Sequence, residues 1–131
     1  MASSKRAPAT HAGPKTPTSL QSSIVIADNA SMTGTNLVTL GPNTVVHPRA
    51  RINSLFGPVT VGSTCIVSER CQIGLQSPPL LEQKDGVVIE KGVLIEVGAV
   101  VEAKHIGEGS VIEINAKVGK GAVVGKVRLP K

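Results

Sequence analysis

Large aromatic side chains are almost absent from this chain of 131 residues, which contains one phenylalanine and no tryptophan or tyrosine. Aromatic rings fill wide protein cores and provide the platforms on which nucleic-acid bases stack. Their scarcity therefore favours a narrow core. The formal net charge is +5, but its excess of lysine and arginine lies before Asp28 and after Glu113. We interpret these residues as the solvated ends of the chain and expect no binding of nucleic acid.

Cysteine and long apolar runs are also scarce. Two cysteines are too few for a disulfide framework, so we expect a reduced, intracellular protein. A membrane-spanning helix needs about 20 predominantly apolar residues in a row, and no segment of the sequence approaches this length. The start of the chain lacks the apolar run of a signal peptide. The sequence therefore predicts an intracellular protein without direct membrane insertion.

An aliphatic residue returns every six residues along most of the chain. A period of six suits neither a helix nor an alternating strand, each of which repeats in its own way. It suits a three-sided prism in which each hexad forms one side and three hexads form one coil. The aliphatic residue, at the first position of its hexad, then points inward and stacks on its equivalent one coil away. The predicted stacks are Leu40, Val61, Ile89, Ile106 and Val124; Val46, Val67, Ile95 and Ile112; and Ile52, Ile73, Val101 and Val118.

Small residues occupy the fifth position of these hexads, where a corner leaves little room. They are Thr44, Ala50, Cys65, Cys71, Ala99, Ser110, Ala116 and Ala122. The two cysteines fall at different corners, so we expect no disulfide between them. Glycine at the second position, as at Gly41 and Gly62, allows close backbone approach or a positive φ. These features predict an all-β parallel β-helix built from hexapeptide repeats. A β-sandwich is disfavoured because its strands would alternate with a period of two.

The composition divides the chain into three parts. Residues 1–23 are rich in serine, threonine, proline, alanine and lysine, and we expect a disordered tail. Residues 24–126 are predicted to form the β-helix, of roughly four to five coils, and residues 127–131 a C-terminal tail.

The repeat is interrupted three times, at residues 52–61, 73–89 and 101–106. The first interruption contains Phe56, and the second contains two prolines followed by an Asp-Gly pair, which predicts a loop that projects from a corner. The third is a hexad that is one residue short. Loops outside a rigid solenoid often carry function.

Catalytic groups are sparse. Hexapeptide-repeat carbonic anhydrases bind zinc through three histidines, whereas acyltransferases of this fold use one histidine as a general base. Of the three histidines here, His11 lies in the predicted tail, and His47 and His105 are too few for the zinc site. His105, at the short hexad, is the one candidate base. We expect no enzyme, no metal and no cofactor. The alternative is a homotrimeric enzyme of either class.

Three stretches of the chain resemble the dynactin subunit 6 family, over about residues 26–125. They are the run Leu-Gly-Pro-Asn-Thr-Val-Val-His-Pro-Arg-Ala-Arg-Ile at 40–52, the run at 95–99 and the run at 111–119. The resemblance implies a left-handed β-helix and a non-catalytic scaffold at the pointed end of dynactin, the complex that couples dynein to cargo on microtubules. It also implies a cytoplasmic, cytoskeleton-associated protein. The partners it implies are dynactin subunit 5, the actin-related protein and the large pointed-end subunit.

Two departures from the family matter. Family members continue for further coils and a C-terminal helix, whereas this sequence stops at Lys131, soon after Val124. We expect either that a partner covers the last coil or that the chain is a shortened isoform or gene model. The loop at 74–86 is also shorter than the family leads us to expect. The candidate partner contacts, chosen near the loops and the end of the prism, are His47, Arg49, Arg51, Phe56, Pro78, Pro79, Leu80 and Val124.

Overall fold

The computed structural model describes residues 18–20, 23–78 and 86–125. Within these ranges the chain forms sixteen short β-strands and no helix. The strands are β1 Thr18–Leu20, β2 Val25–Ile26, β3 Ser31–Thr33, β4 Val38–Leu40, β5 Val45–Val46, β6 Arg51–Asn53, β7 Val59–Val61, β8 Ile66–Val67, β9 Gln72–Ile73, β10 Val87–Ile89, β11 Leu94–Ile95, β12 Val100–Val101, β13 His105–Ile106, β14 Val111–Ile112, β15 Lys117–Val118 and β16 Val123–Val124.

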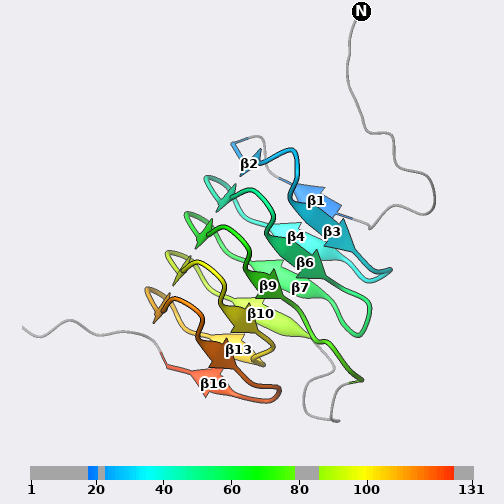
Figure 1. Ribbon diagram of the computed structural model, residues 1–131, viewed down its shortest axis with the longest axis vertical. Helices are drawn as coiled ribbons and strands as arrows, with labels where there is room; N and C mark the ends of the chain where they lie inside the picture. Colours follow the sequence, from blue (N-terminus) through cyan, green and yellow to red (C-terminus); the bar gives the residue numbers. More distant parts are fainter. Residues whose placement is uncertain (1–17, 21–22, 79–85, 126–131) are drawn as a thin grey trace, which may run out of the picture.

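Three parallel sheets form the sides of a prism, and every strand pairs with the strand three places along the chain (Figure 1). Face A is the sheet β1-β4-β7-β10-β13-β16, face B is β2-β5-β8-β11-β14, and face C is β3-β6-β9-β12-β15. Successive coils therefore stack along one axis, in the order of the sequence. The parallel β-helix predicted from the hexad repeat is confirmed.

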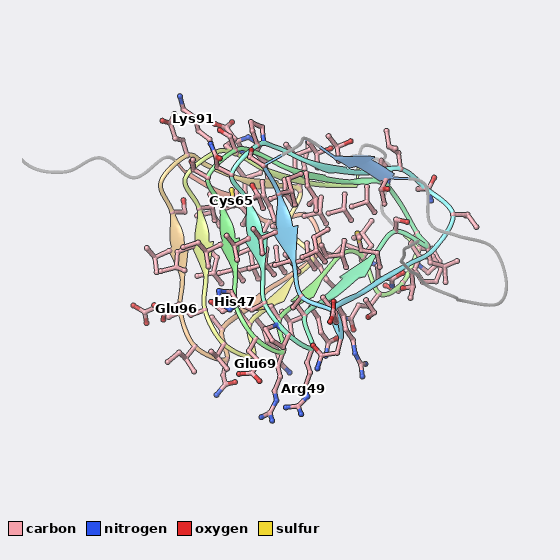
Figure 2. All side chains as sticks on the ribbon, turned by 90° about the horizontal axis from the view of Figure 1, so that it is seen from above. His47, Arg49, Cys65, Glu69, Lys91 and Glu96 are labelled. Atoms are coloured by element: carbon pink, nitrogen blue, oxygen red, sulfur yellow. The ribbon has the colours of Figure 1, made fainter. Side chains whose placement is uncertain are left out.

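The predicted aliphatic stacks are also confirmed by the strand register. On face A, Leu40 pairs with Val61, which pairs with Ile89, and the row continues to Ile106 and Val124. The rows on faces B and C follow the predicted order as well. Their side chains point into the narrow interior (Figure 2) and are almost fully buried, except in the last described coil. The core is one column of aliphatic side chains from each face.

At nine described corners the backbone turns at the fourth position of a hexad, where the residue adopts a positive φ between 53° and 83°. These residues are Asn43, Arg49, Thr64, Arg70, Gly92, Gly98, Gly109, Asn115 and Gly121. Of the two reasons that the sequence offered for glycine at the second position, close backbone approach and a positive φ, the first applies to Gly41 and Gly62, whose φ is not positive. A Cβ on Gly41 would lie 2.6 Å from the carbonyl carbon of Gly62.

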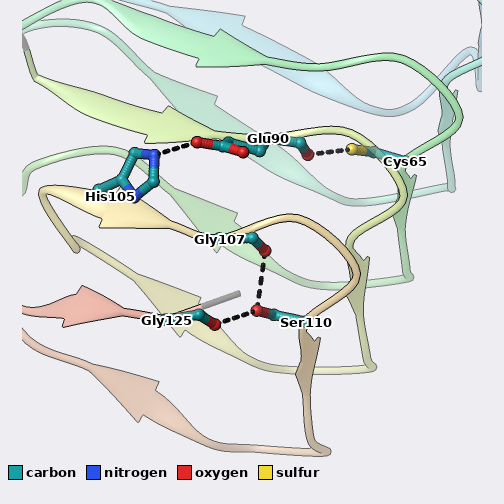
Figure 3. Close-up of polar contacts among 6 residues, drawn as sticks. All are labelled: Cys65, Glu90, His105, Gly107, Ser110 and Gly125. Carbon is teal, nitrogen blue, oxygen red and sulfur yellow. Dashed lines mark hydrogen bonds and ion pairs between the residues drawn. The ribbon is translucent and has the colours of Figure 1, made fainter. Parts of the chain in front are cut away.

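Polar side chains at the fifth position donate to carbonyl oxygens of the next coil. The Thr44 hydroxyl donates to the Gly62 carbonyl over 2.7 Å, and the Cys65 thiol donates to the Glu90 carbonyl over 3.0 Å (Figure 3). The Ser110 hydroxyl oxygen lies 2.8 Å from the carbonyl oxygen of Gly107 in its own coil and 3.2 Å from that of Gly125 in the next coil, so its one proton is shared between two acceptors. Burial of these polar groups is thereby compensated by hydrogen bonds. Val93 departs from the predicted small fifth residue and is buried.

The longest interruptions of the repeat gather at the corner between faces C and A. Asn36 donates from its amide nitrogen to the Ser54 carbonyl over 2.7 Å, and Asn53 likewise reaches the Leu75 carbonyl over 3.2 Å. Gly74, with φ 126°, allows the backbone of Asn53 to approach so closely that a Cβ would clash. The loops at this corner are therefore packed on one another. Residues 79–85 lie outside the described part.

The paired region begins earlier than we expected. Thr18–Leu20 lies within the segment predicted to be a disordered tail up to residue 23, yet it forms β1 and pairs with β4. The spacing contains the reason, because Leu20, Ile26 and Met32 continue the six-residue period backwards. Residues 1–17 and 21–22 of the predicted N-terminal tail and the predicted C-terminal tail at 127–131 lie outside the described residues.

Candidate protein-binding surface

An arginine cluster lines the corner between faces B and C. Arg49, Arg51 and Arg70, together with Asn29, Ser31 and Gln72, surround a solvent-exposed hollow of about 440 Å³. Arg49 and Arg70 hold the same fourth position in consecutive coils, and Arg51 begins β6 with Gln72 as its Cα partner. Neighbouring strands in a sheet lie about 4.8 Å apart. The guanidinium groups of two coils are thus close enough to meet one anionic segment. We call this hollow the BC hollow.

One carboxylate reaches the cluster among the described residues. Glu69 Oε2 lies 3.5 Å from Arg49 Nη1, and both side chains project from the corner (Figure 2). The side chain of Arg49 is 58% exposed and that of Glu69 is 42% exposed. Exposed ion pairs contribute less than about 1 kcal/mol, because water and salt screen them. The pair therefore leaves the BC hollow positively charged and open to another anion.

The BC hollow contains Arg49 and Arg51, two of the predicted partner contacts. Sequence analysis missed Arg70, whose side chain completes the cluster. The signal was present in the repeat: Arg70 has the hexad position of Arg49 one coil later, so the two stack at one corner.

The remaining predicted contacts that the structure describes lie at separate places on the prism. His47 is exposed near the same corner but does not line the BC hollow. Phe56 and Val124 are half-buried and pack against the core. Pro78 is exposed, and its carbonyl oxygen accepts a hydrogen bond from Lys120 Nζ at 2.8 Å. The other two predicted contacts, Pro79 and Leu80, lie outside the described residues.

A second feature of the surface is an outward-facing aliphatic row on face B, which we call the aliphatic ladder. Its members are paired in register along five strands and are Val25, Val45, Ile66, Leu94 and Val111. Three of them are exposed, with relative areas of 59%, 41% and 51% for Val25, Ile66 and Val111. The equivalent rows on faces A and C include threonine, histidine, arginine, glutamine and lysine. Continuous apolar surface of this kind is typical of protein contacts.

His105, the candidate catalytic base, lies on face A. Its Nε2 is 2.6 Å from Glu90 Oε2 (Figure 3), and the two side chains are 36% and 44% exposed. A carboxylate can orient an imidazole in this way for proton transfer. His105 does not line the BC hollow or the neighbouring hollow beside Arg51, Asn53 and Gln76. The contact between His105 and Glu90 is thus a partly exposed one on face A, away from both of these hollows.

The described residues also bear on metal, membrane and thiol chemistry. No group of three or more histidine, cysteine, aspartate or glutamate side chains there could hold a metal ion. No helix that could span a membrane occurs in the same ranges. Cys65 and Cys71 are free and buried. Desolvation by burial raises the pKa of both thiols, although nearby backbone hydrogen bonds lower it in part.

Comparison with curated proteins gives matches that share one name. The chain is 34% identical over 92 residues to dynactin subunit 6 of Xenopus tropicalis, a match that covers 66% of this chain and 46% of the relative. Dynactin subunit 6 of Danio rerio is 34% identical over 93 residues, and that of Nematostella vectensis is 31% identical over 107 residues. The chain is a dynactin subunit 6-like protein. It spans about half the length of these curated relatives, from 46% to 56%.

Solved structures share the fold of this dynactin subunit 6-like chain. The acetyltransferase domain of PglB from Neisseria gonorrhoeae matches with a TM-score of 0.66 and 18% identity, over 86% of this chain and 48% of that one. A putative acetyltransferase from Bacillus cereus matches with a TM-score of 0.55 and 25% identity, over 83% of this chain and 69% of that one. No protein-family model matches the sequence.

Proposed function

We propose that this chain is a non-catalytic scaffold subunit at the pointed end of dynactin, where it supports dynein-driven transport of cargo on microtubules. The observation that carries the proposal is the similarity to dynactin subunit 6 in three species, at 31–34% identity. In this function the chain pairs with dynactin subunit 5 and contacts the actin-related protein and the large pointed-end subunit. It is then a cytoplasmic, cytoskeleton-associated protein.

The surface of the prism supports a role in assembly. The aliphatic ladder exposes a row of apolar side chains on a rigid sheet, and a neighbouring subunit would remove them from water. Each buried Å² of apolar surface contributes roughly 25 cal/mol, so a row of this kind is a substantial source of binding energy. A scaffold needs such surfaces and a stiff body, and it does not need a substrate cleft.

The alternative, a homotrimeric acyltransferase or carbonic anhydrase, has less support. The acetyltransferase neighbours share the fold, and one fold hosts many functions. For acyl transfer, His105 would have to lie in a cleft made between copies of the chain. For the zinc reaction, three histidines would have to converge between subunits.

Sedimentation of the tagged chain from a cell extract tests the proposal. The tag is placed on the endogenous chain, and the proteins that migrate with it are identified. We expect migration in a very large assembly that contains the actin-related protein and dynactin subunit 5. Migration as a small homotrimer would overturn the scaffold function and make His105 the first residue to mutate.

A further inference from the structure

The BC hollow carries a positive charge that the described chain neutralises only in part. Three guanidinium groups line it, those of Arg49, Arg51 and Arg70, and the exposed Arg49–Glu69 contact is the ion pair present. Like charges on neighbouring strands repel one another and destabilise the sheet. We propose that the BC hollow binds a carboxylate-rich, extended segment of another protein chain. This goes beyond the scaffold function and does not depend on it, because all of the groups involved belong to this chain.

The backbone gives no reason for arginine at this corner. Arg49 and Arg70 both adopt a φ of 64°, a conformation that glycine and asparagine adopt at lower cost than long side chains. Later coils have glycine and asparagine at the equivalent position, where Gly98 has φ 76° and Asn115 has φ 60°. The corner can therefore turn without arginine. Two consecutive coils place guanidinium groups there instead, and an anionic ligand accounts for that choice.

The lining also indicates the chemistry of the ligand. The three residues that complete the hollow, Asn29, Ser31 and Gln72, are polar and neutral, so the lining provides hydrogen bonds and no apolar anchor. Guanidinium groups bind carboxylates through two parallel hydrogen bonds. The ligand is therefore polar and anionic, and its selection depends on paired charges.

The spacing of the arginines favours an extended peptide. Arg49 lies at the corner, Arg51 begins β6 just after it, and both line the BC hollow. Alternate side chains of an extended ligand point to the same side, so a segment with an acidic residue at every second position can offer a carboxylate to each guanidinium group. Arg70, one coil away, adds a contact across the segment. Nucleic acid fits less well, because single strands bind through aromatic stacking platforms as well as basic grooves, and the lining contains no aromatic side chain.

Fluorescence anisotropy with the purified full chain tests the proposal. The probe is a short fluorescein-labelled peptide of alternating glutamate and serine. The control peptide has glutamine at every glutamate position and carries no side-chain charge. The test variant is Arg49→Asn/Arg70→Asn, which removes two charges and puts a residue that suits the positive φ at both positions. A second variant, Arg51→Gln, removes the third charge from a strand position. The control, Lys91→Asn/Lys104→Asn, removes two exposed charges outside the BC hollow.

We expect the chain to bind the glutamate peptide, with an affinity that falls as the salt concentration rises. We expect no binding of the glutamine peptide. The double arginine variant should bind on the order of a hundredfold more weakly, with an unchanged or higher melting temperature, and the lysine control should bind normally. If the arginine variants bind the glutamate peptide as tightly as the wild type does, the proposal is overturned. Tighter binding of a single-stranded oligonucleotide than of the glutamate peptide would overturn it in favour of a nucleic-acid site. If the double variant does not fold, Arg51→Gln decides between the same outcomes.

Discussion

The sulfur of Cys71 lies 2.8 Å from the carbonyl oxygen of Glu96, which belongs to the next coil. Cys65 makes the same contact with Glu90 at the neighbouring corner, where Thr44 and Ser110 use hydroxyl groups instead. A polar side chain at the fifth position thus donates a hydrogen bond to a carbonyl oxygen of the coil that follows it. A thiolate at this place would face a carbonyl oxygen and would have lost its water.

This geometry predicts that stability falls in alkali through the two thiols. Burial raises the pKa of Cys65 and Cys71 above the ordinary value of 9.0, so the thiols stabilise the fold fully below that pH. The contribution is lost as pH rises through the higher pKa of the folded state. We expect the free energy of unfolding to fall more steeply with pH in the wild type than in Cys65→Ala/Cys71→Ala. Urea unfolding between about pH 8 and pH 10 measures it. Alanine suits this position, as Ala50 and Ala99 show. Parallel loss in the two proteins would contradict the prediction.

The aliphatic core predicts a severe effect of charge in its middle coil. Ile95 is fully buried in the row between Val67 and Ile112. Ile95→Asp places a carboxylate where no water and no partner can reach it, so we expect a loss of more than about 4 kcal/mol, enough to unfold the prism. Ile95→Val, the control, should cost about 1 kcal/mol. Circular dichroism during thermal unfolding measures both, and an unchanged melting temperature for the aspartate variant would refute the stacking.

The aliphatic ladder predicts a loss of assembly without a loss of fold. Ile66 is 41% exposed on the outer side of β8. Ile66→Lys adds a charge to that surface and leaves the core untouched, so we expect the variant to melt within a few degrees of the wild type. In cell extract it should leave the large assembly. Thr60→Lys is the control at the outward position of face A. Retention of the Ile66 variant in the assembly would show that face B is not a contact surface.

The scaffold function predicts that His105 is dispensable. Its contact with Glu90 is partly exposed, and removal of such surface pairs changes stability by about 0.5 kcal/mol or less. We expect His105→Ala to fold, to stay in the large assembly and to restore transport in cells that lack the wild-type chain. The measurement is the speed and frequency of cargo movement after replacement of the endogenous chain. A variant that assembles normally but does not restore transport would point to chemistry at His105.

The hexad spacing sufficed to predict the fold because each inward residue contacts its equivalent three hexads away. That rule gave the rows through Leu40, Val46 and Ile52, which the register confirms. The left-handed sense came from the family resemblance, since the spacing alone is silent on handedness. The first strand was missed because the polar composition around Leu20 outweighed a period that already included it.

The candidate surface was harder to predict, for a physical reason. Arg49 and Arg51 were singled out from their local run, but Arg70 lies 21 residues after Arg49. Their proximity arises only when the coils are laid on one another with the correct insertions between them. The same holds for His105 and Glu90, whose contact depends on the short hexad before Ile106. Phe56 was chosen for its place in a loop, and its side chain is half-buried against the core, which the repeat pattern does not indicate.

The three-hexad offset of the parallel register has a consequence for how such a chain changes over evolutionary time. Residues on one face are separated in sequence by residues that belong to the other two faces, and outward side chains take no part in the core. Mutations can therefore replace the outward residues of one face while the outward residues of the other two faces stay unchanged. The outer surface of each face can therefore vary separately from the other two, and each can acquire or lose a binding partner without a new fold.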